Sequence, residues 1–252
     1  MYNPHAIIEV FHLLLLRQLE SKLDKGLYAL KGGCNLRFFF KSILYSEDID
    51  FDVTTISKTT LENKVNKIIE SVDFRRILQS RNLEIIQTSA AKQTDTTQRW
   101  KFLLRHKESA APLPTKIEFS RRKMDTGVTY ETIDNDLISQ YHLYPILCNH
   151  YSCGAAFLQK VDALINRTQT QARDIFDLKL LLDQGADFSK LKKPTHDEIL
   201  IAVENVERIH YQHFKGQVIA YLMEEYKNLF DSKEKWHEIQ ISVINSLLRE
   251  ER

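Results

Sequence analysis

The segment from Asp48 to Val53 carries three aspartates in strict alternation with apolar residues. A period of two is that of a β-strand, so Asp48, Asp50 and Asp52 are expected on one face and the apolar residues on the other. Same-face neighbours lie about 7 Å apart, given a rise of about 3.3 Å per residue. Like charges this close raise each other's pKa unless a cation neutralises them. Taken alone, the pattern fits equally a site for a hard divalent cation such as Mg²⁺ and an acidic edge strand that resists aggregation.

A glycine pair, Gly32-Gly33, precedes this acidic strand. It follows a short apolar segment and opens a brief helix expected from Cys34 to Lys41. Glycine at such a junction lets the backbone approach a ligand, and the free N–H groups at a helix start suit phosphate. A Gly-Gly alone is more often a simple turn. Followed by one short helix and a D-x-D strand, it predicts a phosphate cradle beside a metal site.

A third carboxylate is expected near the first two, because two metal ions need a shared set of ligands. Glu118 is the candidate, since it lies within the strand-like segment Lys116–Phe119 and its neighbours there are apolar. Its alternation mirrors that of Asp50. The other interpretation is an exposed acid on a strand.

The elements that must position these residues divide the chain in two. Helical spacing is found over 3–24 and 60–80, and strand patterns over Leu83–Thr88 and Arg99–Arg105. After about residue 150 only helices are expected, over 152–166, 171–184, 196–210, 213–230 and 234–250. The sequence thus predicts an α+β fold. Its N-terminal domain, 1–150, combines strands and helices, and its second domain, 151–252, is helical.

Composition is that of a globular protein, with 43% hydrophobic and 27% charged residues. The three cysteines have no C-x-x-C spacing, which argues against a zinc site or a disulfide framework and favours a reduced compartment. Charged residues interrupt the apolar run near the N-terminus, a pattern typical of an amphipathic helix rather than a signal peptide or a membrane span. We expect a cytoplasmic protein with no membrane partner.

The formal net charge of +1 provides no global field for nucleic acid. Basic residues nevertheless cluster at 99–107 and at 121–123, where they could grip a phosphate backbone or a triphosphate or simply be solvated. No G-x-S-x-G or G-x-x-x-x-G-K-[ST] motif is present. Those absences disfavour a serine hydrolase and a P-loop NTPase.

Taken together, the motifs resemble the polymerase-β-like nucleotidyltransferase superfamily and, more narrowly, the AbiEii/AbiGii-type toxins. The matching segments are Leu30–Arg37, Tyr45–Phe51, Lys160–Arg167 and Arg173–Leu178. Two positions depart from the family pattern. Cys34 stands where a threonine or serine is usual and offers only a weak donor, and Glu118 replaces an aspartate.

The resemblance implies a nucleotidyltransferase-like sheet and a set of site residues. The catalytic residues would be Asp48, Asp50, Glu118, Lys160 and Asp174, of which Asp48, Asp50 and Glu118 would bind two Mg²⁺ ions. The nucleotide would be bound by Gly32, Gly33, Cys34, Ser46, Lys160 and Arg173. Lys160 would contact the triphosphate, and Asp174 would orient the acceptor hydroxyl or hold Lys160 and Arg173. Helix spacing alone suggests only an i, i+4 ion pair between Arg173 and Asp177.

The function implied is that of a toxin, paired with a separately encoded antitoxin, that transfers a nucleotide from NTP onto RNA, plausibly the tRNA acceptor end, or onto a protein hydroxyl. The alternative is a non-catalytic module that binds RNA or protein on a degenerate nucleotidyltransferase scaffold.

Overall fold

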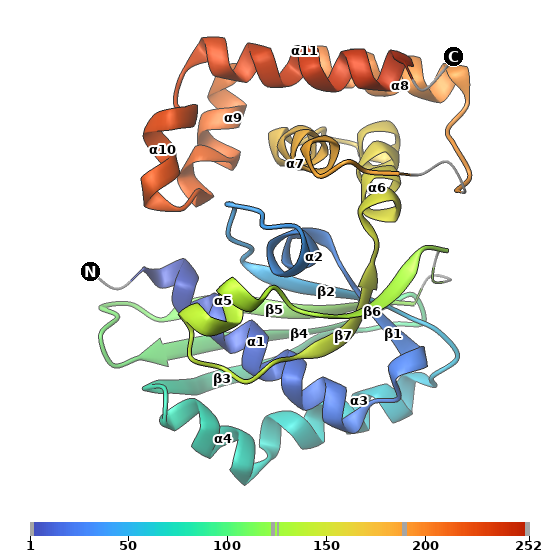
Figure 1. Ribbon diagram of the computed structural model, residues 1–252. Coiled ribbons are helices and arrows are strands. Elements are labelled where there is room, and N and C mark those ends of the chain that lie inside the picture. Colours follow the sequence, from blue (N-terminus) through green and yellow to red (C-terminus); the bar gives the residue numbers. More distant parts are fainter. Residues whose placement is uncertain (1–2, 122–123, 125, 188–190, 250–252) are drawn as a thin grey trace. The chain divides into compact units, whose positions relative to one another are not determined.

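The computed structural model describes residues 3–121, 124, 126–187 and 191–249. The chain packs as two compact units, which we call unit 1 (Met1–Phe39 and Tyr45–His150) and unit 2 (Phe40–Leu44 and Tyr151–Arg252). Unit 1 holds a mixed sheet with helices, and unit 2 is helical (Figure 1). The α+β fold class expected from the sequence is confirmed.

Seven strands form one sheet in the part of the chain that the structure describes, in the order β3-β4-β5-β2-β1-β7-β6. Their bounds are Tyr28–Lys31 (β1), Asp48–Val53 (β2), Leu83–Gln93 (β3), Thr97–His106 (β4), Leu113–Ser120 (β5), Val128–Thr132 (β6) and Leu147–Tyr151 (β7). The acidic strand β2 lies between β5, to which it is parallel, and β1, to which it is antiparallel. The site residues on β2 are therefore central in the sheet.

Unit 1 contains the helices α1 (Pro4–Lys22), α2 (Gly32–Phe39), α3 (Lys58–Glu70), α4 (Val72–Gln79) and α5 (Asn135–Gln140), with a 3-10 turn at Lys25–Leu27. Of these, α1 and α3 pack against the apolar face of β4, whereas α2 contacts β1 and β2. Phe11 of α1 packs edge-on against Phe102 of β4, with the ring centroids 5.2 Å apart. The indole of Trp100 donates a hydrogen bond to Asn66 of α3. Because side chains alternate along a strand, Arg99, Lys101 and the β2 aspartates are left on the opposite face.

Unit 2 is built from α6 (Cys153–Asn166), α7 (Ala172–Asp183), α8 (His196–Glu207), α9 (Tyr211–Gln217), a 3-10 turn (Ile219–Tyr221), α10 (Glu224–Phe230) and α11 (Lys233–Arg249). Side-chain caps fix two of the helix starts, Ser152 before α6 and Thr195 in a capping box before α8. Phe214 stacks on Trp236 at 4.6 Å in its core. None of the helices in the described ranges is both long and apolar enough to cross a bilayer.

Two helix predictions are wrong in extent. Residues 60–80 form two helices because the Ser71 hydroxyl accepts a hydrogen bond from the Phe74 N–H and starts α4 there. Residues 213–230 break into α9, a 3-10 turn and α10. The sequence patterns also missed β6, α5 and β7, which are each only five or six residues long.

Candidate active site

The three aspartates of β2 differ in their partners, although they share a strand face. Asp48 accepts a bond from the Lys116 ammonium at 2.7 Å, and Asp52 accepts one from Lys31 at 2.5 Å. Asp50 lies between them, and no cation among the described residues is bonded to its carboxylate. Asp50 is therefore the acid with an unmet demand for positive charge.

Burial raises the pKa of Asp50 from 3.8 to about 6, and the negative charges of Asp48 and Glu118 act in the same direction. Lys116 and Lys31 oppose that shift without cancelling it. The ionised form of this carboxyl is thus held at a cost in free energy. A bound cation would remove that cost.

This cost predicts a pH-dependent stability. The pKa of Asp50 is higher in the folded state, so the folded state binds more protons, and stability falls as pH rises from about 4 through about 6. We expect Asp50→Asn to be more stable than wild type at neutral pH, by up to about 3 kcal/mol, with the gain shrinking below about pH 5. Urea denaturation of both proteins in EDTA, at neutral pH and below about pH 5, measures the difference in their free energies of unfolding. Equal stability at neutral pH would contradict the environment assigned to Asp50.

Glu118 of β5 is the register partner of Asp50 on β2. Its carboxylate is not free, because Arg99 of β4 bonds it at 2.6 Å through Nε and at 2.5 Å through a terminal nitrogen. Within the described ranges, no group of three or more histidine, cysteine or acidic side chains is arranged to hold a metal. The donor chemistry and mutual repulsion of Asp48 and Asp50 fit a divalent cation. To bind it, Asp48 would have to exchange Lys116 for the metal, and Glu118 would have to leave Arg99.

Gly32 and Gly33 open α2 directly after β1. Gly32 has a φ of +67°, and a Cβ atom there would lie 3.2 Å from Oδ2 of Asp50. A Cβ at Gly33 would lie 2.7 Å from the Ser46 hydroxyl oxygen. The helix start is thus packed closely against Asp50 and Ser46, and a side chain at either glycine would force its neighbour to move.

We expect Gly33→Ala to destabilise the protein by about 1–3 kcal/mol, because the added methyl group overpacks the site against Ser46. Ser46→Gly in the same chain removes both atoms that the methyl group would meet and should restore much of the loss. Chemical denaturation of the two single variants and the double variant forms a double-mutant cycle. Additive effects would mean that the close approach does not exist.

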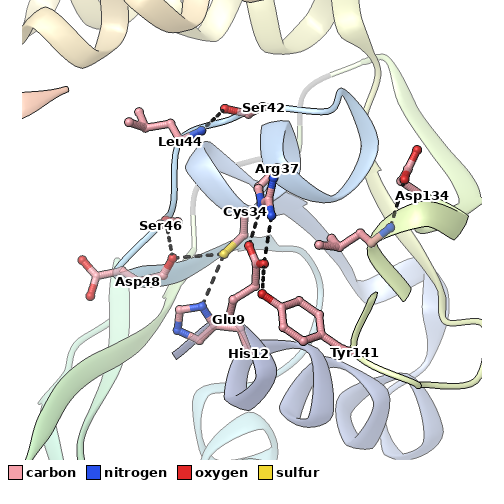
Figure 2. Close-up of polar contacts among 11 residues, drawn as sticks. Glu9, His12, Cys34, Arg37, Ser42, Leu44, Ser46, Asp48, Asp134 and Tyr141 are labelled. Carbon is pink, nitrogen blue, oxygen red and sulfur yellow. Dashed lines mark hydrogen bonds and ion pairs between the residues drawn. The ribbon is translucent and has the colours of Figure 1, made fainter. Parts of the chain in front are cut away.

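Ser46 and Cys34 both direct their donors to the backbone of Asp48 (Figure 2). The Ser46 hydroxyl donates to the Asp48 carbonyl oxygen at 2.8 Å, and the Cys34 thiol contacts the same oxygen at 3.2 Å. Burial is the main reason that the pKa of Cys34 is well above its usual value, so the thiol stays protonated. These two predicted nucleotide-binding residues therefore hold the N-terminal end of β2 in place, at Asp48.

His12 of α1 is a site residue that the sequence patterns missed. Its side chain is buried, and burial lowers its pKa to about 3, so the ring is neutral. The Thr115 hydroxyl donates to the Glu47 carbonyl oxygen at 2.6 Å, so His12 Nε2, 2.7 Å away, donates to Thr115. Nδ1 lies 3.6 Å from the Cys34 sulfur (Figure 2). His12 therefore braces both β5 and α2 beneath Asp48.

A second buried network anchors α2. Arg37 donates from Nε to Glu9 of α1 at 2.7 Å and from a terminal nitrogen at 3.2 Å, and the Tyr141 hydroxyl donates to the same carboxylate at 2.6 Å (Figure 2). Each oxygen of Glu9 is thereby bonded, as a buried carboxylate requires. This network fixes the helix that begins at the glycine pair.

In unit 2, Lys160 of α6 bonds Asp174 at 3.0 Å and Asp177 at 2.7 Å, both on α7. Arg167 bonds Asp174 at 2.5 Å. Burial alone would lower the pKa of Lys160, but the charges of Asp177 and Asp174 raise it above its usual value, so the ammonium stays charged. An ammonium has three donors, and these bonds use two. The Arg173 guanidinium lies over the Tyr221 ring, 5.0 Å from its centroid.

The structure therefore groups the predicted site residues in two sets. The first set lies around the N-terminal end of β2 in unit 1 and consists of Gly32, Gly33, Cys34, Ser46, Asp48, Asp50 and Glu118. Lys160 and Asp174 are joined in unit 2, with Arg173 on the same helix. Of the second basic cluster, Arg121 donates to Gln98 and to the Ile56 carbonyl, whereas residues 122–123 lie outside the described residues.

Comparison with known proteins provides evidence for the family of this chain. A family model described as nucleotidyl transferase AbiEii toxin, type IV TA system, matches residues 14–242. No curated protein matches the chain significantly.

Solved structures share the fold. MenT4, a nucleotidyltransferase toxin from Mycobacterium tuberculosis H37Rv, is similar at a TM-score of 0.69 and 15% identity over 97% of this chain and 84% of that one. JHP933 from Helicobacter pylori is similar at 0.61 and 16% identity over 99% and 96%. A putative nucleotidyltransferase from H. pylori is similar at 0.61 and 17% identity over the full length of both chains.

Proposed function

This chain belongs to the AbiEii family of nucleotidyl transferase toxins, and we propose that it is a magnesium-dependent enzyme that transfers a nucleotide from NTP to an acceptor hydroxyl. The acceptor oxygen bonds to the α-phosphorus, the bond from that phosphorus to its bridging oxygen breaks, and pyrophosphate leaves with the electron pair. The hydroxyl proton passes to solvent. The product is the acceptor carrying a nucleoside monophosphate.

The observation that carries this proposal is the pairing of Asp50 with the helix start. Asp50 has no cation bonded to it in the described ranges, its pKa is raised to about 6, and the backbone of Gly32 lies against its carboxylate. A negative site with an unmet charge next to a backbone cradle suits a metal–triphosphate complex. An acidic strand that was simply exposed to solvent would not require glycine at position 32 or position 33.

Each set of site residues has a proposed role. Asp48 and Asp50 would hold two Mg²⁺ ions, together with Glu118 once it leaves Arg99. The ions would neutralise charge on the phosphates and lower the pKa of the attacking hydroxyl. Gly32 and Gly33 receive the triphosphate through backbone N–H groups. Cys34 and Ser46 support this nucleotide site by holding the Asp48 backbone.

The unit 2 residues have proposed roles as well. Lys160 uses its third donor on a phosphate oxygen, and Asp174 fixes the direction of that ammonium. Arg173 assists in nucleotide binding. Charge stabilisation of this kind provides most of the catalysis in phosphoryl transfer.

The proposed acceptor is RNA, such as the tRNA acceptor end, or a protein hydroxyl, and a cognate antitoxin is the proposed partner. The proposed location is the cytoplasm, where NTP, magnesium and RNA occur together. Incubation of the protein with Mg²⁺, each labelled NTP and total RNA or lysate tests the proposal. Label should appear in an RNA or a protein band; with no label in either, transfer activity would have to be abandoned.

The second candidate is a non-catalytic module that binds RNA or protein. Two ion pairs favour it, because Lys116 and Arg99 already neutralise Asp48 and Glu118. Thermal unfolding with and without Mg²⁺ plus each NTP separates the candidates. A nucleotide-binding site gains stability by mass action, whereas a degenerate scaffold gains none.

A further inference from the structure

A cavity of about 150 Å³ in unit 1 is lined by α1, the start of β3, the end of β4 and the end of α5. Its floor is apolar and at most 9% exposed, with Ile7 and Val10 from α1 and Leu83 from β3. His106, the register partner of Leu83, completes the floor. Because side chains alternate along β4, His106 shares the face of Trp100 and not that of the β2 aspartates. The cavity is thus separate from the candidate active site.

A fixed cation lies at the rim of this cavity. Arg81, two residues before Leu83, donates from its two terminal nitrogens to the carbonyl oxygens of Tyr141 and His142, each at 2.9 Å. Tyr141 and His142 also line the cavity, so these bonds hold the guanidinium at its edge. A guanidinium has five N–H donors, and the two bonds leave three. Among the described residues, no carboxylate is bonded to Arg81.

The other polar groups of the cavity supply donors without a negative charge. Gln140 adds an amide at the rim. Nδ1 of His106 accepts a hydrogen bond from the Glu108 N–H at 3.2 Å, so the ring proton of His106 is on Nε2. None of the residues that line the cavity in the described part of the chain is acidic. The cavity therefore offers positive charge and N–H donors to a ligand that is an anion.

The backbone of His142 is held in a conformation that costs free energy. Its φ is +50°, in the left-handed region, and it follows Tyr141, the C-cap of α5. Glycine is the usual residue at this position of a helix end. Non-glycine residues in such conformations cluster at ligand-binding sites. A histidine here therefore points to a use for its imidazole at the cavity rim.

The size of the cavity limits the ligand. A protein cavity of about 150 Å³ holds benzene, so the ligand has about six non-hydrogen atoms. A phosphate group would take about five of these and leave the apolar floor unfilled. A carboxylate takes three and matches the planar fork of a guanidinium. The remaining atoms are then a short hydrocarbon chain.

We propose that this cavity binds a short-chain carboxylate. Its carboxylate group is held at the rim by Arg81 and His142, and its hydrocarbon chain lies on the floor against Ile7, Val10 and Leu83. The site is independent of the proposed transferase function, because it shares no residue with the acids or the glycine pair.

Titration of full-length protein with butyrate, at constant ionic strength and without Mg²⁺ or NTP, tests the proposal. The histidine ring signals in nuclear magnetic resonance spectra report binding. Butanamide has nearly the same shape without the charge, and formate has the charge without the chain. Each is expected to bind about tenfold or more weakly than butyrate.

Two variants locate the site. Arg81→Met should weaken butyrate binding about tenfold or more, and His142→Gly about threefold or more. His142→Gly should be at least as stable as wild type, because glycine adopts the left-handed conformation without strain; unfolding therefore would not explain its loss of affinity. The matched controls are Arg76→Met, an exposed position on α4, and Thr55→Gly, an exposed position with a φ of +51°. Neither residue lines the cavity, and both controls should bind butyrate as wild type does.

The outcomes decide between a built site and simpler binding. Equal affinity for butyrate and butanamide would mean an apolar hollow, and equal affinity for butyrate and formate would mean a surface cation; either result overturns the proposal. Wild-type butyrate affinity in His142→Gly, or in a folded Arg81→Met protein, would overturn it as well. So would equal losses in Arg81→Met and Arg76→Met, which would assign the effect to the general charge of unit 1.

Discussion

Asp50→Asn is expected to reduce nucleotide transfer by about 10³-fold or more, equivalent to about 4 kcal/mol of transition-state stabilisation. The substitution keeps the shape of the side chain and removes its charge. Asp50 is the β2 acid with no bonded cation in the described part of the chain, so its charge is the one available to a metal. Incorporation of labelled NTP by wild type and variant at equal concentration measures the effect.

Asp52→Asn is the matched control for this result, because Asp52 lies on the same strand face but is already bonded to Lys31. We expect it to lose less than about tenfold in transfer rate. Circular dichroism of both variants checks that the sheet is intact. Equal losses of transfer rate in the two variants would mean that transfer depends on the total negative charge of β2 and not on Asp50 in particular. Transfer at the wild-type rate in Asp50→Asn would exclude Asp50 as a metal ligand.

Lys160→Met is expected to lower the free energy of unfolding by about 3–5 kcal/mol, the usual cost of leaving a buried charge without its partner. Asp177 is 3% exposed and is bonded by Lys160. Without Lys160, the ion pair left to Asp174 within the described residues is the one with Arg167. Methionine fills a similar volume without the charge, so the loss is electrostatic rather than a cavity effect. Urea denaturation of wild type and variant measures the change.

Two further variants test whether the loss of stability comes from the unpaired buried carboxylate. Lys160→Met with Asp177→Asn removes the unpaired carboxylate and should recover part of the stability. Lys179→Met removes an exposed i, i+4 pair with Asp183 and should change stability by less than about 0.5 kcal/mol. An unchanged Lys160→Met protein that has nevertheless lost transfer would assign Lys160 wholly to the substrate and not to the fold.

Much of the fold could be predicted because its signals are local. The period of two in Asp48–Val53 is visible in a short window of the chain, and so is the apolar run Leu13–Leu16 of α1, a helix that is buried on all sides rather than amphipathic as expected. β7 could not be found this way, because its residues Leu147–Tyr151 include Asn149 and His150 and are set by pairing with β1. β3 extends to Gln93 for the same reason, since its polar half is held by β4.

The sequence predicted that the acids Asp48, Asp50 and Glu118 would lie close together, but it did not predict the basic residues that bond two of them. Strand register depends on long-range packing, so neither the Lys116–Asp48 pair nor the Arg99–Glu118 pair follows from spacing alone. One signal was available for the first pair, since Lys116 lies in a strand-like segment and opposite charges on neighbouring strands attract, which favours the register that places Lys116 against Asp48. His12 gave no signal, because a single histidine in an apolar helix is most often a core residue.

The most direct test of the metal-binding role of Asp48 and Asp50 is a titration with Mn²⁺, a paramagnetic substitute for Mg²⁺, in the presence of a non-hydrolysable NTP analogue, followed by electron paramagnetic resonance. Wild-type protein should bind Mn²⁺ only when the analogue is present or far more tightly with it, and Asp48→Asn and Asp50→Asn should each lose that binding while Asp52→Asn retains it. Mn²⁺ binding by all four proteins with the same affinity would show that the β2 carboxylates do not hold the metal.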